Sequence, residues 1–273
     1  MGEPGNPATT ANSRSWSRRR VLGGFGAAAS MAAAVTVIPL SQIPVASRPE
    51  SIKEASATTT NRQWGMVIDM RLCDGCNQCQ VDCQKTHYLA KDQEWIKVFT
   101  LVDDQGLKSF MPRLCMMCEN APCLKVCPTG ATFKNPEGII LVDQSKCIGC
   151  RMCMVACPYE ARYFNYKKPP TPPAPYPNPM PEFPVPQQQG TVGKCILCAH
   201  YTEKGQLPAC VAGCSMNALF IADLNSDVMA NGSGAIFQVS KYLRDSDAYR
   251  YKEELNTSPR VWYIAGHGQN LDF

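Results

Sequence analysis

Short apolar runs separated by polar turns recur between residues 63 and 224. Runs of four to seven residues rich in β-branched and aromatic side chains are typical of short strands. One pair of runs flanks Asn135-Pro136-Glu137-Gly138, a favourable hairpin turn. The strands predicted in this way span residues 64–69, 96–102, 131–134, 139–143, 162–166 and 219–222. With only short helical stretches beside them, they predict an α+β fold of small antiparallel strand pairs with little conventional core.

A different pattern occupies the N-terminal 45 residues. A polar start is followed by Ser17-Arg18-Arg19-Arg20-Val21-Leu22 and by an Ala/Gly-rich apolar stretch up to Leu40. A basic region before an apolar one is typical of an export signal, and paired arginines after a serine resemble the twin-arginine signal. Val21 and Gly23 stand where that pattern usually has Phe and often has Lys. We expect export by the twin-arginine route, with the signal either removed or kept as an anchor; an ordinary secretory signal is the alternative.

The segment from 169 to 186 contains ten prolines in eighteen positions. Such a sequence cannot join a helix or sheet and favours an extended polyproline II conformation. Tyr176, Met180 and Phe183 are interleaved apolar residues, so we expect a strap laid over a partner subunit, with a passive linker as the alternative. After Cys214 no apolar run has transmembrane length, and residues 241–254 predict a charged surface helix.

Charge and composition add one decisive feature. The formal net charge of +4 is modest and forms no basic stripe in the body of the chain, so we expect no nucleic-acid partner. All sixteen cysteines lie between positions 73 and 214. The three histidines, His87, His200 and His267, are too few to complete several mixed zinc sites.

The cysteines fall into four groups of four. The first and third groups have the spacing C-x2-C-x2-C-x3-C of bacterial ferredoxins, and the third also has the trailing proline, Pro158. The groups are Cys73, Cys76, Cys79 and Cys83; Cys115, Cys118, Cys123 and Cys127; Cys147, Cys150, Cys153 and Cys157; and Cys195, Cys198, Cys210 and Cys214. This pattern predicts one [4Fe–4S] cluster per group of ligands, four in all.

The ferredoxin spacing has a physical reason. Three cysteines, each separated from the next by two residues, wind a short loop around one cluster, and the fourth lies on the next helical turn and caps the neighbouring cluster. Gly75 and Gly149 let the backbone approach closely and aim N–H groups at sulfur.

Three alternatives remain open from the residues alone. Structural zinc uses pairs of C-x2-C and does not need a third cysteine two residues on and a fourth three residues later. A disulfide framework suits an exported protein, although cysteines two residues apart rarely bond without strain. Fewer than four clusters, or one three-iron cluster, is the third.

The stretch from Trp64 to about His267 resembles the four-cluster iron–sulfur subunit of the dimethyl sulfoxide, polysulfide and tetrathionate reductase class. The resemblance includes residues around the ligands: Gly65-Met66-Val67-Ile68-Asp69, Cys118-Glu119-Asn120-Ala121-Pro122-Cys123, Cys127-Pro128-Thr129-Gly130-Ala131 and Leu207-Pro208-Ala209-Cys210. Gln84 and Ser215, at positions where a proline can follow the group, and the long proline segment depart from the pattern.

The resemblance implies that ligands are exchanged between the first and fourth groups and between the second and third. The implied ligand sets are Cys73, Cys76, Cys79 and Cys214 for cluster 1; Cys83, Cys195, Cys198 and Cys210 for cluster 2; Cys127, Cys147, Cys150 and Cys153 for cluster 3; and Cys115, Cys118, Cys123 and Cys157 for cluster 4.

It also implies a fold of two interleaved ferredoxin-like modules. The expected organisation is a signal at 1–45, a linker at 46–62, a first module split between 63–114 and 191–224, a second module at 115–167, a proline-rich strap at 168–190 and an extension at 225–273. The expected partners are a catalytic subunit, with molybdopterin favoured, facing the first cluster and a membrane quinone-binding subunit facing the last. The expected location is the extracytoplasmic face of the membrane.

A few other residues invite interpretation. His87 and His200 are expected to be surface histidines, with cluster tuning or proton transfer as the alternative. Met116, Met117, Met152 and Met154 are expected to pack against the clusters and exclude water. Lys125, Lys146 and Arg151 are candidates for offsetting cluster charge, with plain solvation as the alternative.

These features predict a non-catalytic electron relay. The alternatives are a relay for a nickel–iron hydrogenase, a quinol dehydrogenase without a molybdopterin partner, a chain that turns over a small substrate alone, and a scaffold with purely structural clusters. Stepwise reductive titration separates a relay, with several reducible clusters and no turnover alone, from the last two.

Overall fold

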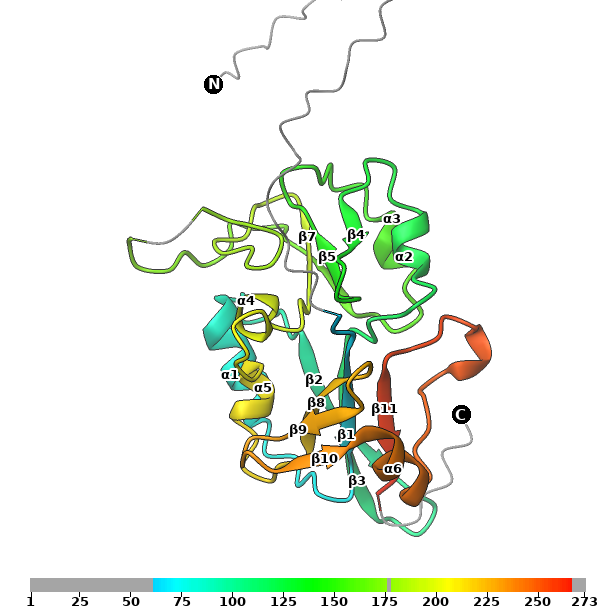
Figure 1. Ribbon diagram of the computed structural model, residues 1–273. Helices are drawn as coiled ribbons and strands as arrows, with labels where there is room; N and C mark the ends of the chain where they lie inside the picture. Colours follow the sequence, from blue (N-terminus) through cyan, green and yellow to red (C-terminus); the bar gives the residue numbers. More distant parts are fainter. Residues whose placement is uncertain (1–60, 176–177, 267–273) are drawn as a thin grey trace, which may run out of the picture. The chain divides into compact units, whose positions relative to one another are not determined.

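The computed structural model describes residues 61–175 and 178–266 (Figure 1). The expected signal, nearly all of the linker, Tyr176 and His267 lie outside the described residues. The strands are β1 (Trp64–Asp69), β2 (Ile96–Val102), β3 (Lys108–Leu114), β4 (Thr132–Lys134), β5 (Ile140–Val142), β6 (Arg162–Phe164), β7 (Val192–Lys194), β8 (Leu219–Asp223), β9 (Val228–Ala230), β10 (Ile236–Gln238) and β11 (Val261–Ile264). The helices are α1 (Gln78–His87), α2 (Pro122–Lys125), α3 (Met152–Val155), α4 (Ala199–Thr202), α5 (Ala209–Ala212), α6 (Val239–Asp245) and the short 3₁₀ helix η3 (Glu253–Leu255).

A five-stranded sheet is the largest element of the described chain. Its order is β10-β9-β8-β1-β11, with β1 antiparallel to β8 and parallel to β11. Side chains of a strand alternate between the two faces, so Met66 and Ile68 enter the core that contains the cysteines, while Val67 enters a second apolar layer with Val239 of α6. The expectation of little conventional core is therefore wrong. The sheet was missed because its strands come from distant parts of the chain and are completed by residues 228–264.

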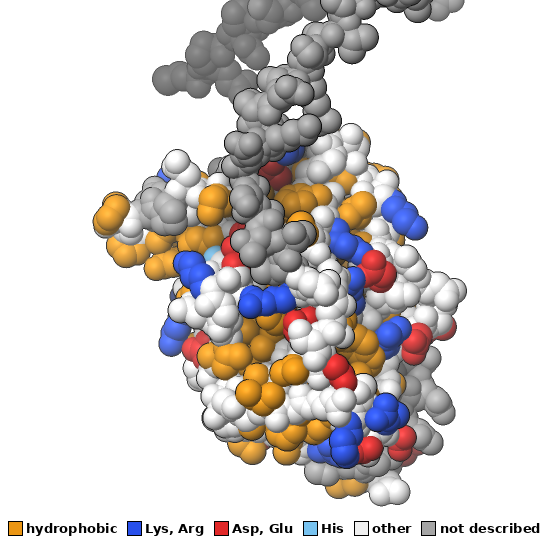
Figure 2. All heavy atoms as spheres, in the orientation of Figure 1, with side chains coloured by type: hydrophobic (Ala, Val, Ile, Leu, Met, Phe, Trp, Pro, Cys, Tyr) orange, Lys and Arg blue, Asp and Glu red, His pale blue; other side chains and the backbone are white. Residues whose placement is uncertain are grey.

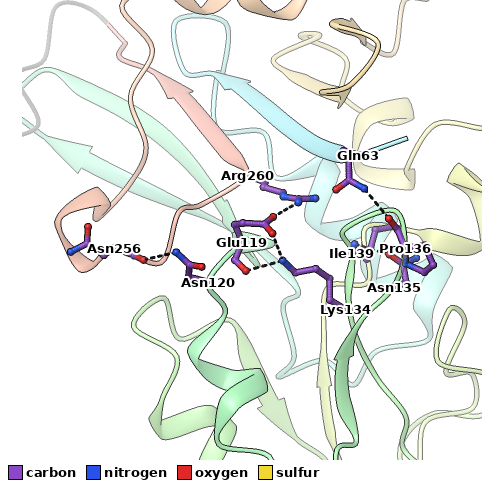
Figure 3. Close-up of polar contacts among 9 residues, drawn as sticks. All are labelled: Gln63, Glu119, Asn120, Lys134, Asn135, Pro136, Ile139, Asn256 and Arg260. Atoms are coloured by element: carbon purple, nitrogen blue, oxygen red, sulfur yellow. Dashed lines mark hydrogen bonds and ion pairs between the residues drawn. The ribbon is translucent and has the colours of Figure 1, made fainter. Parts of the chain in front are cut away.

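Three two-stranded antiparallel sheets complete the α+β fold. They pair β2 with β3, β4 with β5 and β6 with β7, all antiparallel. The turn predicted between β4 and β5 is present, and its Asn135 Oδ1 accepts a hydrogen bond from the Ile139 N–H at 2.8 Å (Figure 3). All six predicted strands are confirmed, with ends that move by one or two residues. The predicted C-terminal surface helix is shorter than expected, since α6 ends at Asp245.

The proline segment connects β6 to β7, and its end packs onto this chain. Val185 is buried, and Phe183 stacks against His200 with ring centroids 4.3 Å apart. Met180 is exposed. Of the described anchors expected to face a partner, only Met180 is therefore free to do so, because Phe183 is used within the chain.

The C-terminal residues 257–260 hold the loop that carries the second cysteine group. The Arg260 N–H donates to Met116 O at 2.9 Å, and the Glu119 N–H donates to Ser258 O at the same distance. The Glu119 carboxylate also lies between Lys134 of β4, at 2.8 Å, and Arg260, which precedes β11 (Figure 3). The hairpin β4–β5 and the five-stranded sheet are thus joined through this loop. Among the described helices, none is both long and apolar enough to cross a membrane.

Candidate functional site

Each cysteine group contains two cysteines that are four residues apart on or beside a short helix. These pairs are Cys79 and Cys83 on α1, Cys123 and Cys127 at α2, Cys153 and Cys157 at α3, and Cys210 and Cys214 at α5. Four residues advance a helix by about 6 Å and return to nearly the same side. Each helix therefore presents two sulfurs, one turn apart, along one side.

Three cavities are each bordered by four cysteines. The remaining lining is largely apolar, with Val98 and Leu219 in the first, Val142 and Val192 in the second, and Met116 and Ile140 in the third. The cysteines are Cys73, Cys76, Cys79 and Cys214 in the first, Cys127, Cys147, Cys150 and Cys153 in the second, and Cys115, Cys118, Cys123 and Cys157 in the third.

The other four cysteines also lie together. Burial raises the pKa of Cys83 well above its usual value, with further rises from Cys195 and Cys198. Burial raises the pKa of Cys210 likewise, with contributions from Cys198, Cys83 and Cys195. Mutual electrostatic effects of this kind require short separations between the thiols. The cysteines of each implied ligand set thus lie together, and each set contains residues from two groups. We call these sets 1 to 4, after the clusters they are expected to hold.

Thiols of neighbouring sets act on one another electrostatically at three places. The thiol of Cys79 acts on that of Cys210, which joins the first set to the second. Cys115 acts on Cys195, which joins the second set to the Cys115 set. Cys123 acts on Cys153, which joins that set to the Cys127 set. In space the sets therefore follow the order 1, 2, 4, 3 of the ligand sets, and not their numerical order.

Burial divides these sets into two ends and a middle. Cys76 of set 1 and Cys150 of set 3 are exposed, whereas all four cysteines of set 2 are buried. In set 4, Cys157 is partly exposed and the other three cysteines are buried. Burial raises the pKa of Cys118 to about 12 and that of Cys198 to about 12. Iron binding must displace these protons, since thiolates are the ligands.

The backbone of every group curls in the same way. The residue before the second cysteine has a positive φ: 78° for Gly75, 45° for Met117, 71° for Gly149 and 49° for Leu197. This conformation turns successive N–H groups toward one side and forms an anion-binding concavity. The Leu197 N–H reaches Cys195 Sγ at 3.4 Å. The sequence indicated this curl only where glycine occurs, because Met117 and Leu197 carry no comparable signal.

Two buried cations lie beside the inner sets. Arg162 is 5% exposed and lines the cavity of set 4, and its Nη2 is buried without a hydrogen-bond partner. Burial lowers the pKa of Arg162, but Cys123 and Cys153 raise it, and the net pKa shift is upward. Lys194 is 1% exposed, and its Nζ donates to the carbonyls of Ile140 and Cys195.

The sequence does not show that either cation is buried. Their only signal is proximity to a ligand, since Lys194 directly precedes Cys195 and Arg162 follows the third group. The three cations that were considered, Lys125, Lys146 and Arg151, are all exposed.

His87 is not the surface residue expected. It is 1% exposed, and its Nε2 lies 3.2 Å from Cys198 Sγ. Burial lowers its pKa to about 3, with a smaller contribution from His200. Of the methionines expected to exclude water, Met116 and Met117 are buried, whereas Met152 is 52% exposed.

These sites fit iron–sulfur clusters better than single metal ions or disulfides. All sixteen cysteines are free, which excludes a disulfide framework in this structure. Within the described residues, no group of three or more His, Cys, Asp or Glu side chains is placed to hold one metal ion. The sulfurs instead border cavities, and the unpartnered Arg162 Nη2 beside one of them suits an anionic group.

Comparison with known proteins agrees with this chemistry. Residues 107–171 match the 4Fe-4S dicluster domain family. The chain is 37% identical to a selenate reductase subunit of Mesobacillus selenatarsenatis, over 74% of this chain and 72% of that protein. It is 35% identical to the menaquinone reductase iron-sulfur cluster-binding subunit of Nitratidesulfovibrio vulgaris, over 74% of this chain and 89% of that protein. It is 32% identical to a tetrathionate reductase subunit of Salmonella typhimurium, over 91% of this chain and 88% of that protein. The chain therefore belongs to the family of [4Fe–4S] electron-transfer subunits of the dimethyl sulfoxide, selenate and tetrathionate reductase class.

Proposed function

We propose that this chain holds four [4Fe–4S] clusters and relays electrons between two partner subunits. The proposed ligands are the four cysteine sets: set 1 with Cys214, set 2 with Cys83, set 3 with Cys127 and set 4 with Cys157 as the ligand exchanged from the paired group. Each bound cluster supplies a one-electron redox centre. The pairing of the first group with the fourth, and of the second with the third, corresponds to two interleaved ferredoxin-like modules.

The observation that carries this proposal is the electrostatic effect of each set's thiols on those of the next set. Cys79 with Cys210, Cys195 with Cys115, and Cys123 with Cys153 link all four sets into one line. A relay needs such a continuous line, whereas separate structural centres do not. The protein keeps the middle of the line dry and leaves one cysteine exposed at each end, Cys76 and Cys150.

Both ends carry exposed apolar side chains suited to docking. Leu72 and Met216 lie near set 1 in sequence and are 40% and 43% exposed. Ile148 and Val155 flank set 3 in sequence and are 67% and 85% exposed. On the face shown in Figure 2, apolar side chains lie between scattered acidic and basic side chains. Exposed apolar side chains beside both end sets suit docking, so we assign one end to each partner. Because set 3 and not set 4 is at the second end, the membrane partner is proposed to face Cys150.

The proposed partners are a catalytic subunit, with molybdopterin favoured, and a quinone-reactive membrane subunit. Support comes from relatives named as subunits of selenate and tetrathionate reductases and as part of a menaquinone reductase. The Arg18-Arg19 pair supports export of the folded protein to the outer face of the membrane.

Iron analysis and redox titration test the proposal together. Anaerobically purified protein should contain about sixteen iron and sixteen sulfide per chain, and reductive titration should show four reducible centres without turnover. A zinc-rich preparation from iron-replete anaerobic expression, or a single reducible centre, would count against the relay.

A further inference from the structure

His87 occupies a defined position at the end of α1. Cys83 lies one helical turn before it, so both side chains project from the same side of the helix. The next residue, Tyr88, has a φ of 49° and donates its N–H to Gln84 O, which ends the helix. The helix end therefore fixes His87 beside the sulfurs of set 2.

The contact between His87 and Cys198 has one consistent assignment of the proton. The distance from Nε2 to Sγ is 3.2 Å, and the pair is buried. A cysteine bound to iron is a thiolate and has no proton to donate, so the hydrogen must be on Nε2. The neutral ring then has a bare lone pair on Nδ1, which agrees with a buried Nδ1 that has no hydrogen-bond partner.

Aromatic rings enclose this contact. Ring centroids lie 4.9 Å from His87 for Trp95, 5.5 Å for His200 and 6.3 Å for Phe183. Phe183 belongs to the proline segment, so the end of that segment covers the contact. A hydrogen bond in such a dry environment is electrostatically stronger than one in water.

We propose that His87 is a positioning residue for the relay, and that its Nε2–H bond to Cys198 Sγ raises the reduction potential of the cluster held by set 2. Reduction adds negative charge to the cluster and its thiolates, and hydrogen bonds to sulfur stabilise that charge. Set 2 lies between the exposed set 1 and the buried set 4, so this potential governs passage from one end of the line to its middle. This inference rests on the proposed function.

The test is a potentiometric titration of the anaerobically purified full chain, followed by EPR. His87→Phe keeps an aromatic ring but removes the donor. At the potential where the wild-type centre is half reduced, the ratio of reduced to oxidised centre should fall about tenfold, or roughly 59 mV for a one-electron couple. The other three midpoints should not move. His87→Gln has an amide N–H within reach of the same sulfur and should restore most of the wild-type potential.

His200→Phe is the matched control, because His200 belongs to the same ring cluster and its nearest ring partners are Phe183 and Tyr201. It should leave all four midpoints unchanged. Unmoved midpoints in an iron-replete His87→Phe protein, or equal shifts in His87→Phe and His87→Gln, would overturn the role of His87. If His87→Phe does not retain iron, the test uses wild-type protein with ¹⁵N-labelled histidine. We expect magnetic coupling between a histidine nitrogen and a reduced centre, and the absence of this coupling would overturn the inference. Fewer than four reducible centres in wild-type protein would instead reject the proposed function.

Discussion

At the scale of single residues, two cations next to the cysteine sets are buried. Arg162 and Lys194 are almost fully buried, whereas Lys125, Lys146 and Arg151 are exposed. A buried charge is costly unless a nearby opposite charge offsets it. Thiolate-bound clusters carry that opposite charge, so these two residues and the clusters stabilise one another. The sequence could not separate them from solvated residues, because burial depends on strands that pair far apart in the chain.

Replacing Arg162 should therefore change two potentials and leave two alone. Arg162→Met removes a positive charge beside Cys123 and Cys153. We expect lower reduction potentials for the centres of sets 3 and 4, because the reduced state loses electrostatic stabilisation. EPR-monitored titration measures this. Arg162→Lys keeps the positive charge and should recover part of the lost potential.

Arg250→Met is the control for this prediction, because Arg250 stacks over Trp262 at 5.0 Å. Equal shifts at all four centres in the Arg162→Met protein would contradict a local effect of Arg162.

At the scale of elements, the positions of the strands and cysteine loops could be predicted from the sequence. The backbone conformation of the loops could be predicted only in part. The turn at Asn135 and the runs that form β1, β2 and β8 carried local signals, and all are present. The left-handed residues Met117 and Leu197 did not, because such a conformation in a non-glycine residue is imposed by its surroundings. Where glycine does occupy this position, the space around it explains why.

Gly149 has no room for a side chain. Its φ is +71°, and an added Cβ would lie 2.3 Å from Gly190 O. We expect Gly149→Ala to destabilise the loop by at least about 2 kcal/mol, and to lower both the iron content and the temperature at which the visible absorbance bleaches.

Gly130→Ala provides a matched comparison. Gly130 also has a positive φ, +66°, but nothing lies within 4 Å of its added Cβ. It should cost only about 1 kcal/mol from backbone strain and retain full iron content. Similar losses in both variants would mean that the contact with Gly190 is unimportant.

At the scale of the whole molecule, a charged contact ties the β4–β5 hairpin to the five-stranded sheet. Glu119 accepts from Lys134 and Arg260 together (Figure 3). Its side chain is 50% exposed, so each pair contributes little alone. Glu119→Gln should lower the free energy of unfolding by about 1 kcal/mol, measured by thermal melting under anaerobic conditions. Lys241→Gln, which breaks an exposed pair with Asp245 on α6, should have a smaller effect; the reverse order would contradict a joining role for Glu119.

Removal of iron should loosen one side of the sheet more than the other. The core around Met66 and Ile68 includes eight buried cysteines, whereas the layer of Val67, Phe220 and Val239 contains none. After anaerobic chelation we expect α1 and α5 to lose protection from hydrogen exchange first, while β8 and α6 keep theirs, because metal binding supplies folding energy only to the cysteine side. Mass spectrometry of exchanged peptides measures this. Simultaneous loss on both sides would show a single cooperative unit.

The proposed exchange of ligands between distant groups has a consequence for how the protein is made. Set 4 is complete once the ribosome has produced Cys157, whereas sets 1 and 2 wait for Cys214 and Cys210 near the end of the cysteine region. The first three cysteines to be synthesised therefore lack the fourth ligand of their set until most of the polypeptide has been made. Clusters inserted during synthesis would therefore form first at sets 3 and 4, which are complete at Cys153 and Cys157, and a truncated product would leave sets 1 and 2 incomplete.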